Sequence, residues 1–328
     1  GDFSTFLEKE IFEQPSSIRE SIRGRFDQDY ESVVLGGINT DKDIKRVLFI
    51  GCGSAYNAGL TGKYFMEKVA KIPASVEISS EYKYKNNPTE DVTNTVMSSI
   101  ARQVDEGIYQ RVGPEVSVAS TKAFTSQLTL GLMLSILIGR KNTLSVLESK
   151  RMISYLRRLP SLIDETLSLC KQQCHKLGVH YSMIKEMTFL GRQYMYPIAL
   201  EAALKVRELS YINTIGYASG EMKHGPLASI ENRSRCVFLA PQECLKDKNI
   251  TSMRELKSRG ADITLIKQKH QKFPDDCYDT AVNISKAPEY LLPILATIPM
   301  QLLGLNMAQS KNLNVDQPRN LAKSVTVE

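Results

Sequence analysis

The sequence contains no tryptophan, and it has four histidines and six cysteines among its 328 residues. The cysteines form no Cys-x-x-Cys pair, which excludes the usual zinc-ribbon and dithiol redox motifs and favours reduced thiols. Cys170, Cys174 and His175 lie together in a predicted helix, but no second cluster would complete a tetrahedral metal site. We therefore expect neither a metal nor another cofactor.

A large excess of charge of one sign is also missing. The 42 Lys and Arg residues against 36 Asp and Glu leave a net charge of +6, and the basic residues are scattered along the chain. Binding to nucleic acid needs a concentrated basic surface and a motif that reads bases, and the sequence shows neither. We expect no nucleic-acid partner.

Long hydrophobic runs are absent too. The run at residues 128–138 is interrupted by Thr129, Gly131 and Ser135, and it is shorter than the roughly 20 residues of a membrane-spanning helix. Residues 1–4 show no basic or apolar feature of a signal peptide. We expect a cytoplasmic protein with no transmembrane segment and no membrane partner.

What is present is the composition of an ordinary globular chain. A hydrophobic content of 42% and a charged content of 24% exclude disordered, collagen-like and coiled-coil proteins, and the length is sufficient for two domains. Hydrophobic periodicity predicts strands at 46–50, 74–79, 187–190, 235–239 and 262–266. It predicts helices at 6–15, 16–23, 56–71, 121–139, within 144–177, at 197–212 and at 252–258.

Strands that alternate with helices indicate an α/β fold with parallel, doubly wound sheets. In two places, Ile50-Gly51 and Leu190-Gly191, a strand ends directly in a glycine before a helix, and these places are 140 residues apart. This repeat suggests a duplicated α/β domain.

The first of these glycine turns is Gly-Cys-Gly-Ser-Ala-Tyr at residues 51–56. Tyr56 occupies the place of the third glycine in a dinucleotide-binding fingerprint, which argues against NAD. A glycine turn that opens a helix presents backbone N–H groups, and Ser54 adds a hydroxyl, so a small phosphorylated ligand is a better match. A tight turn without a ligand remains the alternative.

Two further patterns carry ionisable groups. Glu201, Lys205 and Glu208 are spaced i, i+4, i+7 on a mostly apolar helix, so they share a face that is either solvated or part of a site. His224 lies in a loop between glycines beside Lys223, where it is either an exposed histidine or a proton shuttle.

These residues occur in segments that resemble the glucosamine-6-phosphate synthases, in the C-terminal isomerase portion that contains two sugar isomerase (SIS) domains. The similar segments are 9–15, 113–124, 203–211, 220–226 and 316–328, the last reading Asp-Gln-Pro-Arg-Asn-Leu-Ala-Lys-Ser-Val-Thr-Val-Glu. The resemblance implies an N-terminal helical segment at 1–37, SIS domains at 38–145 and 178–319, linking helices at 146–177 and a C-terminal lid at 320–328.

The resemblance also implies an activity. This family makes glucosamine 6-phosphate from fructose 6-phosphate and ammonia that a separate N-terminal glutaminase domain releases from glutamine. This chain would supply the sugar half: ring opening, imine formation and ketose-to-aldose isomerisation in amino-sugar biosynthesis. It would act as a homodimer.

The roles that the resemblance implies fall on particular residues. Glu208 would move the proton between C1 and C2, Lys205 would stabilise the developing oxyanion, and His224 would open the ring from across the dimer interface. Lys323 would close over the sugar. The implied substrate contacts are Gly53, Ser54, Thr89, Val118, Ser120 and Ala322.

One departure from the family lies at residues 88–97. A phosphate-binding loop with the sequence Ser-Gln-Ser-Gly-Glu-Thr should lie between residues 84–88 and 97–102, where only residues 89–96 stand, and Thr89 would be its last hydroxyl. A doubly wound domain without a central strand and helix would expose its core, so we expect residues to be omitted here. If the loop is truly deleted, the chain is instead a regulatory or inactive phosphosugar-binding module. A deglycase acting on an aminated sugar phosphate shares the SIS plan, but the tail at 316–328 resembles the synthases.

Overall fold

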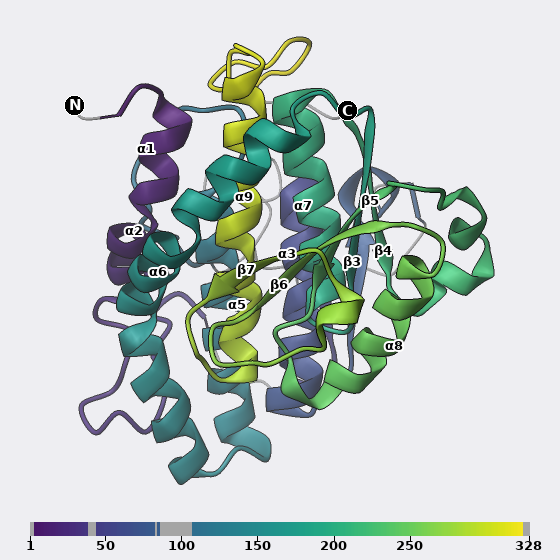
Figure 1. The fold of residues 1–328 in the computed structure, drawn as a ribbon. Helices are drawn as coiled ribbons and strands as arrows, with labels where there is room; N and C mark the ends of the chain where they lie inside the picture. Colours follow the sequence, from purple (N-terminus) through teal and green to yellow (C-terminus); the bar gives the residue numbers. More distant parts are fainter. Residues whose placement is uncertain (1–2, 39–43, 83, 86–106, 324–328) are drawn as a thin grey trace. The chain divides into compact units, whose positions relative to one another are not determined.

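The computed structural model describes residues 3–38, 44–82, 84–85 and 107–323 (Figure 1). The chain divides into two compact units, each made of segments that are far apart in sequence. Unit 1 consists of Gly1–Pro15, Val116–Thr121 and Ser161–Val325, and unit 2 consists of Ser16–Glu115, Lys122–Pro160 and Thr326–Glu328.

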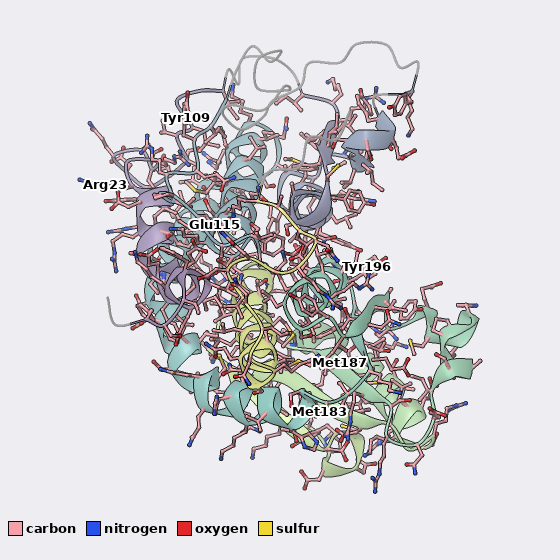
Figure 2. All side chains as sticks on the ribbon, turned by 90° about the horizontal axis from the view of Figure 1, so that it is seen from above. Arg23, Tyr109, Glu115, Met183, Met187 and Tyr196 are labelled. Carbon is pink, nitrogen blue, oxygen red and sulfur yellow. The ribbon has the colours of Figure 1, made fainter. Side chains whose placement is uncertain are left out.

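Unit 1 is built on a sheet of five parallel strands in the order β4-β3-β5-β6-β7. The strands are β3 (Glu186–Gly191), β4 (Asn213–Ala218), β5 (Arg235–Leu239), β6 (Asp262–Gln268) and β7 (Thr280–Ile284). The interior strands are apolar and almost completely buried, as expected for a parallel sheet covered on both faces. Met187 of β3 is buried, whereas Met183, just before the strand, is 86% exposed (Figure 2).

The helices of unit 1 cover both faces of this sheet. They are α1 (Phe6–Phe12), the second part of α6 (Val146–Tyr181), α7 (Met195–Ser210), α8 (Lys246–Lys257) and α9 (Leu292–Ser310). Because parallel crossovers are right-handed, α7 and α8, which lead in opposite directions along the sheet, lie on opposite faces. Figure 1 shows α8 across the sheet from α9, which packs along α7. The doubly wound fold is confirmed for this unit.

Unit 2 contains a parallel pair of strands in its described part, β1 (Val47–Gly51) and β2 (Ala74–Ile78). Its helices are most of α2 (Gln14–Ile22), α3 (Gly53–Phe65), the π-helix η1 (Met66–Ala70), α4 (Ser79–Tyr82), α5 (Lys122–Asn142) and the first part of α6. Gly59 and Gly62 of α3 lie against the ring of Phe49, where a side chain would have little room. The glycines therefore let the helix pack closely on β1.

Several predicted boundaries were wrong. The boundary predicted between residues 15 and 16 lies earlier, because α1 ends at Phe12 and α2 begins at Gln14. Pro15 lies in the first turn of α2, where its missing N–H costs nothing. The helix predicted from residue 56 begins at Gly53, directly after β1, and the helix predicted at 252–258 begins at Lys246. The pattern also missed β4, β7 and α9. The strands β4 and β7 form the edges of the sheet and are only partly buried, which weakens their apolar signal.

The residues 122–142 and 289–310 form helices long and apolar enough to span a membrane. The apolar windows of these two helices are 72% and 94% buried inside the protein, respectively. The helix α9 carries apolar residues on all sides because it is surrounded by other elements of unit 1. Burial in the core thus accounts for the hydrophobicity of both helices.

Candidate active site

The predicted charged face on α7 exists, and most of it is buried. The Nζ atom of Lys205 lies 2.6 Å from Oε2 of Glu208 and 3.6 Å from Oε1 of Glu201. The side chains of Lys205 and Glu201 are 3% and 1% exposed, while that of Glu208 is 22% exposed. Glu208 is therefore the member of this trio that can meet a ligand or exchange a proton with one.

The ion pairs explain why three charges are stable in this helix. A buried ammonium between two carboxylates is compensated, whereas any one of these groups alone would be costly to bury. Glu208 also lies in the last turn of α7, where the helix dipole disfavours a carboxylate, and the Lys205 ammonium opposes that effect. Gly304 of α9 allows close approach here, since a Cβ atom would lie 3.1 Å from Leu209.

The C-terminal tail lies against the end of α7. Lys311 donates a 2.7 Å hydrogen bond to the carbonyl of Ser210, and the backbone N–H of Arg319 donates to the hydroxyl of Tyr211. The Arg319 guanidinium also stacks over the Tyr211 ring, 4.4 Å from its centroid. The described part of the tail, residues 311–323, forms no helix or strand, but these contacts hold it in place.

Lys323, near the end of the described tail, donates a 2.7 Å hydrogen bond to the carbonyl of Ser117. This contact brings Lys323 to the segment 116–121 (the strap), which contains Val118 and Ser120. The N–H of Val118 in turn donates to the carbonyl of Asp316 in the tail. These contacts join Lys323 and Val118, two residues predicted for the site, through the strap and the tail, while Ser120 lies further along the strap. Ala322 is exposed beside Lys323.

Glu10 of α1 anchors the strap and was not singled out from the sequence. Its buried carboxylate accepts hydrogen bonds from the N–H groups of Val116 and Ser117 and from the Ser117 hydroxyl. Three donors around one carboxylate fix the backbone on either side of the Ser117 carbonyl. No local signal reveals this role, because the partners are more than a hundred residues apart in the chain.

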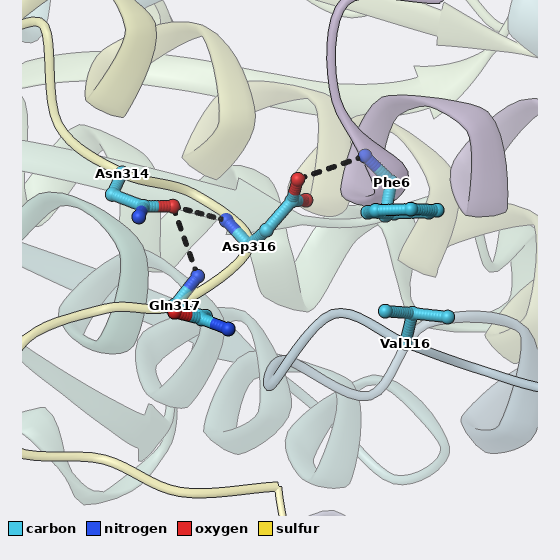
Figure 3. A pocket seen from close by; sticks show the side chains of 5 residues that line it. All are labelled: Phe6, Val116, Asn314, Asp316 and Gln317. Carbon is cyan, nitrogen blue, oxygen red and sulfur yellow. Dashed lines mark hydrogen bonds between the residues drawn. The ribbon is translucent and has the colours of Figure 1, made fainter.

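Asp316 connects the tail to α1 in a similar way. Its carboxylate accepts from the N–H groups of Phe6 and Leu7, at the start of α1, and thereby caps this helix. The open pocket beside it has a volume of about 240 Å³ and is lined by Phe6, Val116, Asn314, Asp316 and Gln317 (Figure 3). This volume is below the roughly 300 Å³ at which small-molecule sites begin, so we assign it no ligand.

His224 ends the short 3-10 helix η2 (Glu221–His224) and is exposed. Its neighbour Lys223 forms an ion pair with Glu255 of α8, with the charged atoms 2.6 Å apart. None of the described contacts joins His224 to Glu208 or Lys323. Its function across a dimer interface therefore stays a prediction.

The remaining predicted residues belong to unit 2 or lie outside the described residues. Gly53 and Ser54 form the first turn of α3, directly after β1, and Gly53 has a left-handed φ of +54° that suits glycine. Thr89 lies outside the described residues. The strand-turn-helix geometry predicted around Gly51 is therefore present, and its ligand stays a prediction.

Cys52, within the same turn, is a second residue that we did not assign to the site. Its Sγ lies 2.7 Å from the Ser79 hydroxyl. Burial raises the pKa of the thiol, but hydrogen bonds with Ser79 and Ser80 outweigh burial, and the pKa is lowered from its ordinary value. Its position between two glycines of a helix-opening turn was the available signal.

The family comparison agrees with the architecture of unit 1. A model described as the SIS domain matches residues 180–310, which include all five strands of the parallel sheet. The C-terminal domain of glucosamine-fructose-6-phosphate aminotransferase from Francisella tularensis has a similar structure, with a TM-score of 0.88 and 30% identity. The match covers 97% of this chain and 99% of that one. The fold and these matches define a SIS-domain protein.

Curated relatives narrow the class. The glutamine–fructose-6-phosphate aminotransferase [isomerizing] of Caldanaerobacter subterraneus is 34% identical over 365 residues, and that of Clostridium tetani is 37% identical over 365 residues. Both matches cover the whole chain, which spans about 60% of the length of each relative. This chain belongs to the glutamine–fructose-6-phosphate aminotransferase family and corresponds to its C-terminal domain.

More distant structures share the fold alone. Glucosamine-6-phosphate deaminase from Thermotoga maritima has a TM-score of 0.70 at 21% identity, over 98% of this chain and all of that one. The architecture is thus compatible with more than one reaction, and the function has to be argued from the site.

Proposed function

We propose that this chain carries the sugar-converting half of the aminotransferase reaction. It takes fructose 6-phosphate and ammonia, which a glutaminase domain outside this chain supplies, and forms glucosamine 6-phosphate. The proposal keeps the two SIS domains at 38–145 and 178–319, a cytoplasmic location and a homodimer.

The observation that carries this proposal is the pairing of Glu208 with Lys205. Conversion of a ketose imine to an aldose requires one base that takes a proton from C1 and returns one to C2. Glu208 suits this role because its carboxylate is partly exposed yet held 2.6 Å from a buried ammonium. Lys205, fixed by Glu201 as well, supplies positive charge where an oxyanion would develop.

The other residues have complementary roles. Lys323 and Ala322 close the site from the tail, and Val118 and Ser120 contact the sugar from the strap. Gly53, Ser54 and Thr89 bind the phosphate, for which a helix N-terminus is a favourable environment. His224 of the second protomer transfers the proton that opens the ring. No cofactor takes part in this scheme.

The decisive test is Glu208→Gln, assayed for interconversion of fructose 6-phosphate and glucose 6-phosphate. The amide keeps the shape but cannot act as a base, so we expect a loss of at least about 100-fold in kcat, with sugar phosphate binding retained. Glu186→Gln is the matched control, because Glu186 is exposed at the amino end of β3, and we expect it to be as active as the wild type. Wild-type turnover in Glu208→Gln would refute the assignment of the base.

A second function is favoured by one observation. The curated relatives match over 365 residues, 37 more than the chain contains. If the phosphate-binding loop is deleted, the chain is a phosphosugar-binding module without turnover. Two results would support this second function: the wild type binds fructose 6-phosphate without isomerising it, and Glu208→Gln binds it in the same way.

A further inference from the structure

The order of strands in unit 1 creates a topological switch point. When the five strands are numbered along the chain, their order across the sheet is 2-1-3-4-5. The connection from β3 therefore leads to β4 on one side of β3, and β5 lies on its other side. In such sheets ligands bind beyond the carboxyl ends of the first and third strands, at this switch point. Here that place lies between the residues after Gly191 of β3 and those after Leu239 of β5. Glu208 is near the opposite end of α7, roughly 20 Å away along a helix of this length.

Arg192 is the first residue after β3, and it brings a positive charge to this switch point. Its Nη2 donates a 3.0 Å hydrogen bond to the hydroxyl of Ser252 on α8. Its Nη1 passes over Gly220, where a Cβ atom would lie 3.2 Å from it. In the described part of the chain the Arg192 guanidinium is partly buried, is paired with no carboxylate, and has no partner for its Nε–H.

Buried polar side chains around Arg192 also lack partners. Asn249, one helical turn before Ser252 on α8, is 1% exposed, and neither atom of its amide has a hydrogen-bond partner among the described residues. The hydroxyl of Ser219, which is 3% exposed and adjoins Gly220, is unpaired within the same set. Unpaired polar atoms at such depth are costly to bury, so several together at one sheet edge indicate a ligand.

The element that carries Asn249 adds a favourable field. The twelve-residue helix α8 begins at Lys246, directly after the 3-10 helix η4 (Glu243–Leu245), and no side chain caps it, so the positive end of its dipole lies at this edge. The neighbouring carboxylates are already engaged by amides: Glu289 accepts from Gln242 at 3.0 Å, and Glu243 accepts from Gln271 at 2.7 Å. Neither neutralises Arg192.

We propose that the switch point of the unit 1 sheet is a second ligand site, which binds the phosphate group of a small phosphorylated metabolite. Arg192 supplies the charge, and Ser219 and Asn249 supply neutral donors. The start of α8 supplies the positive end of its helix dipole. A phosphate group has enough oxygens to accept from all of these donors. This site is separate from the proposed isomerisation and does not depend on it.

The test is calorimetric titration of the whole chain with inorganic phosphate. We expect Arg192→Gln to weaken binding at one site by at least about tenfold, because a charge-assisted hydrogen bond is lost. Arg259→Gln is the matched control, since Arg259 lies exposed just beyond the opposite end of α8, and it should bind like the wild type. Equal affinity and stoichiometry in the wild type and Arg192→Gln, or no binding by the wild type, would overturn the proposal.

A second variant tests the proposal independently in case Arg192→Gln does not fold. Asn249→Ala removes an amide that is unpaired without ligand, so we expect its melting temperature to equal or exceed that of the wild type. Its affinity for phosphate should nevertheless fall about fivefold, for the loss of one neutral hydrogen bond. Unchanged affinity in this variant would contradict the role of Asn249. Competition of fructose 6-phosphate and of a nucleoside diphosphate against phosphate then shows which class of metabolite the site takes.

Discussion

At the scale of single residues, the chemistry of this chain is set by what surrounds each group. Cys52 and Cys236 carry the same thiol group but lie in different surroundings. Burial raises the pKa of the Cys52 thiol, but hydrogen bonds with Ser79 and Ser80 lower it by more. Cys236 lies inside the sheet of unit 1, where burial raises the pKa to about 12. These two cysteines should therefore react very differently.

We predict that iodoacetamide alkylates Cys52 with a pH midpoint below 9, the ordinary value of the thiol, because the thiolate is the reactive form. Cys236 should stay unlabelled over the same range. Peptide mass spectrometry at a series of pH values measures both. Ser79→Ala should move the midpoint for Cys52 upward, and an unchanged midpoint would show that the Ser79 hydroxyl does not stabilise the thiolate.

At the scale of elements, three segments of unit 1 are joined by a few polar contacts. The helix α1 holds the strap through Glu10, and the tail caps α1 through Asp316. The Ser117 carbonyl of the strap in turn accepts a hydrogen bond from Lys323. Removing Glu10 would leave three donors of the strap without their acceptor and would loosen the support of Lys323.

We predict that Glu10→Ala lowers the free energy of unfolding by about 2 kcal/mol, because buried donors lose their partner. Chemical denaturation measures this change. The matched control is Glu13→Ala, whose carboxylate forms a 3.3 Å ion pair with Lys9 at the surface and should contribute less than about 1 kcal/mol. Equal destabilisation by both variants would mean that Glu10 has no special role in the strap.

At the scale of the whole molecule, the described residues of the two units form sheets of different size. Unit 1 has a five-stranded sheet with helices on both faces, whereas the described part of unit 2 has two paired strands. The relatives match over 37 residues more than this chain contains, and the segment where the family's phosphate loop is expected lies outside the described residues. A complete doubly wound domain would need additional strands to cover its core.

We predict that the natural protein carries further residues within the segment 86–102. Trypsin cleaves after Lys85 and Arg102 and nowhere between them, so the sequence as printed would release residues 86–102 as one peptide. We expect mass spectrometry of the natural protein to lack this peptide and to show longer ones in its place. Detection of the 86–102 peptide would establish a true deletion and favour the binding module over the isomerase.

The sequence by itself determined the features that depend on neighbours along the chain. The spacing of Glu201, Lys205 and Glu208 predicted their shared helix face, and alternating apolar strands and helices predicted a parallel, doubly wound sheet. The glycines around Cys52 predicted a strand-turn-helix. Each of these follows from periodicity or turn chemistry, which act over a few residues.

Only the tertiary structure decided what depends on distant partners. It placed Lys323 on the strap, made Glu10 the anchor of that strap, and left Arg192 without a carboxylate partner among the described residues at the switch point of the sheet. The helix α9 has no amphipathic pattern because it is buried on every side, so periodicity could not reveal it. Burial and hydrogen-bond pairing between segments a hundred or more residues apart are properties of the folded chain, and local sequence patterns carry no record of them.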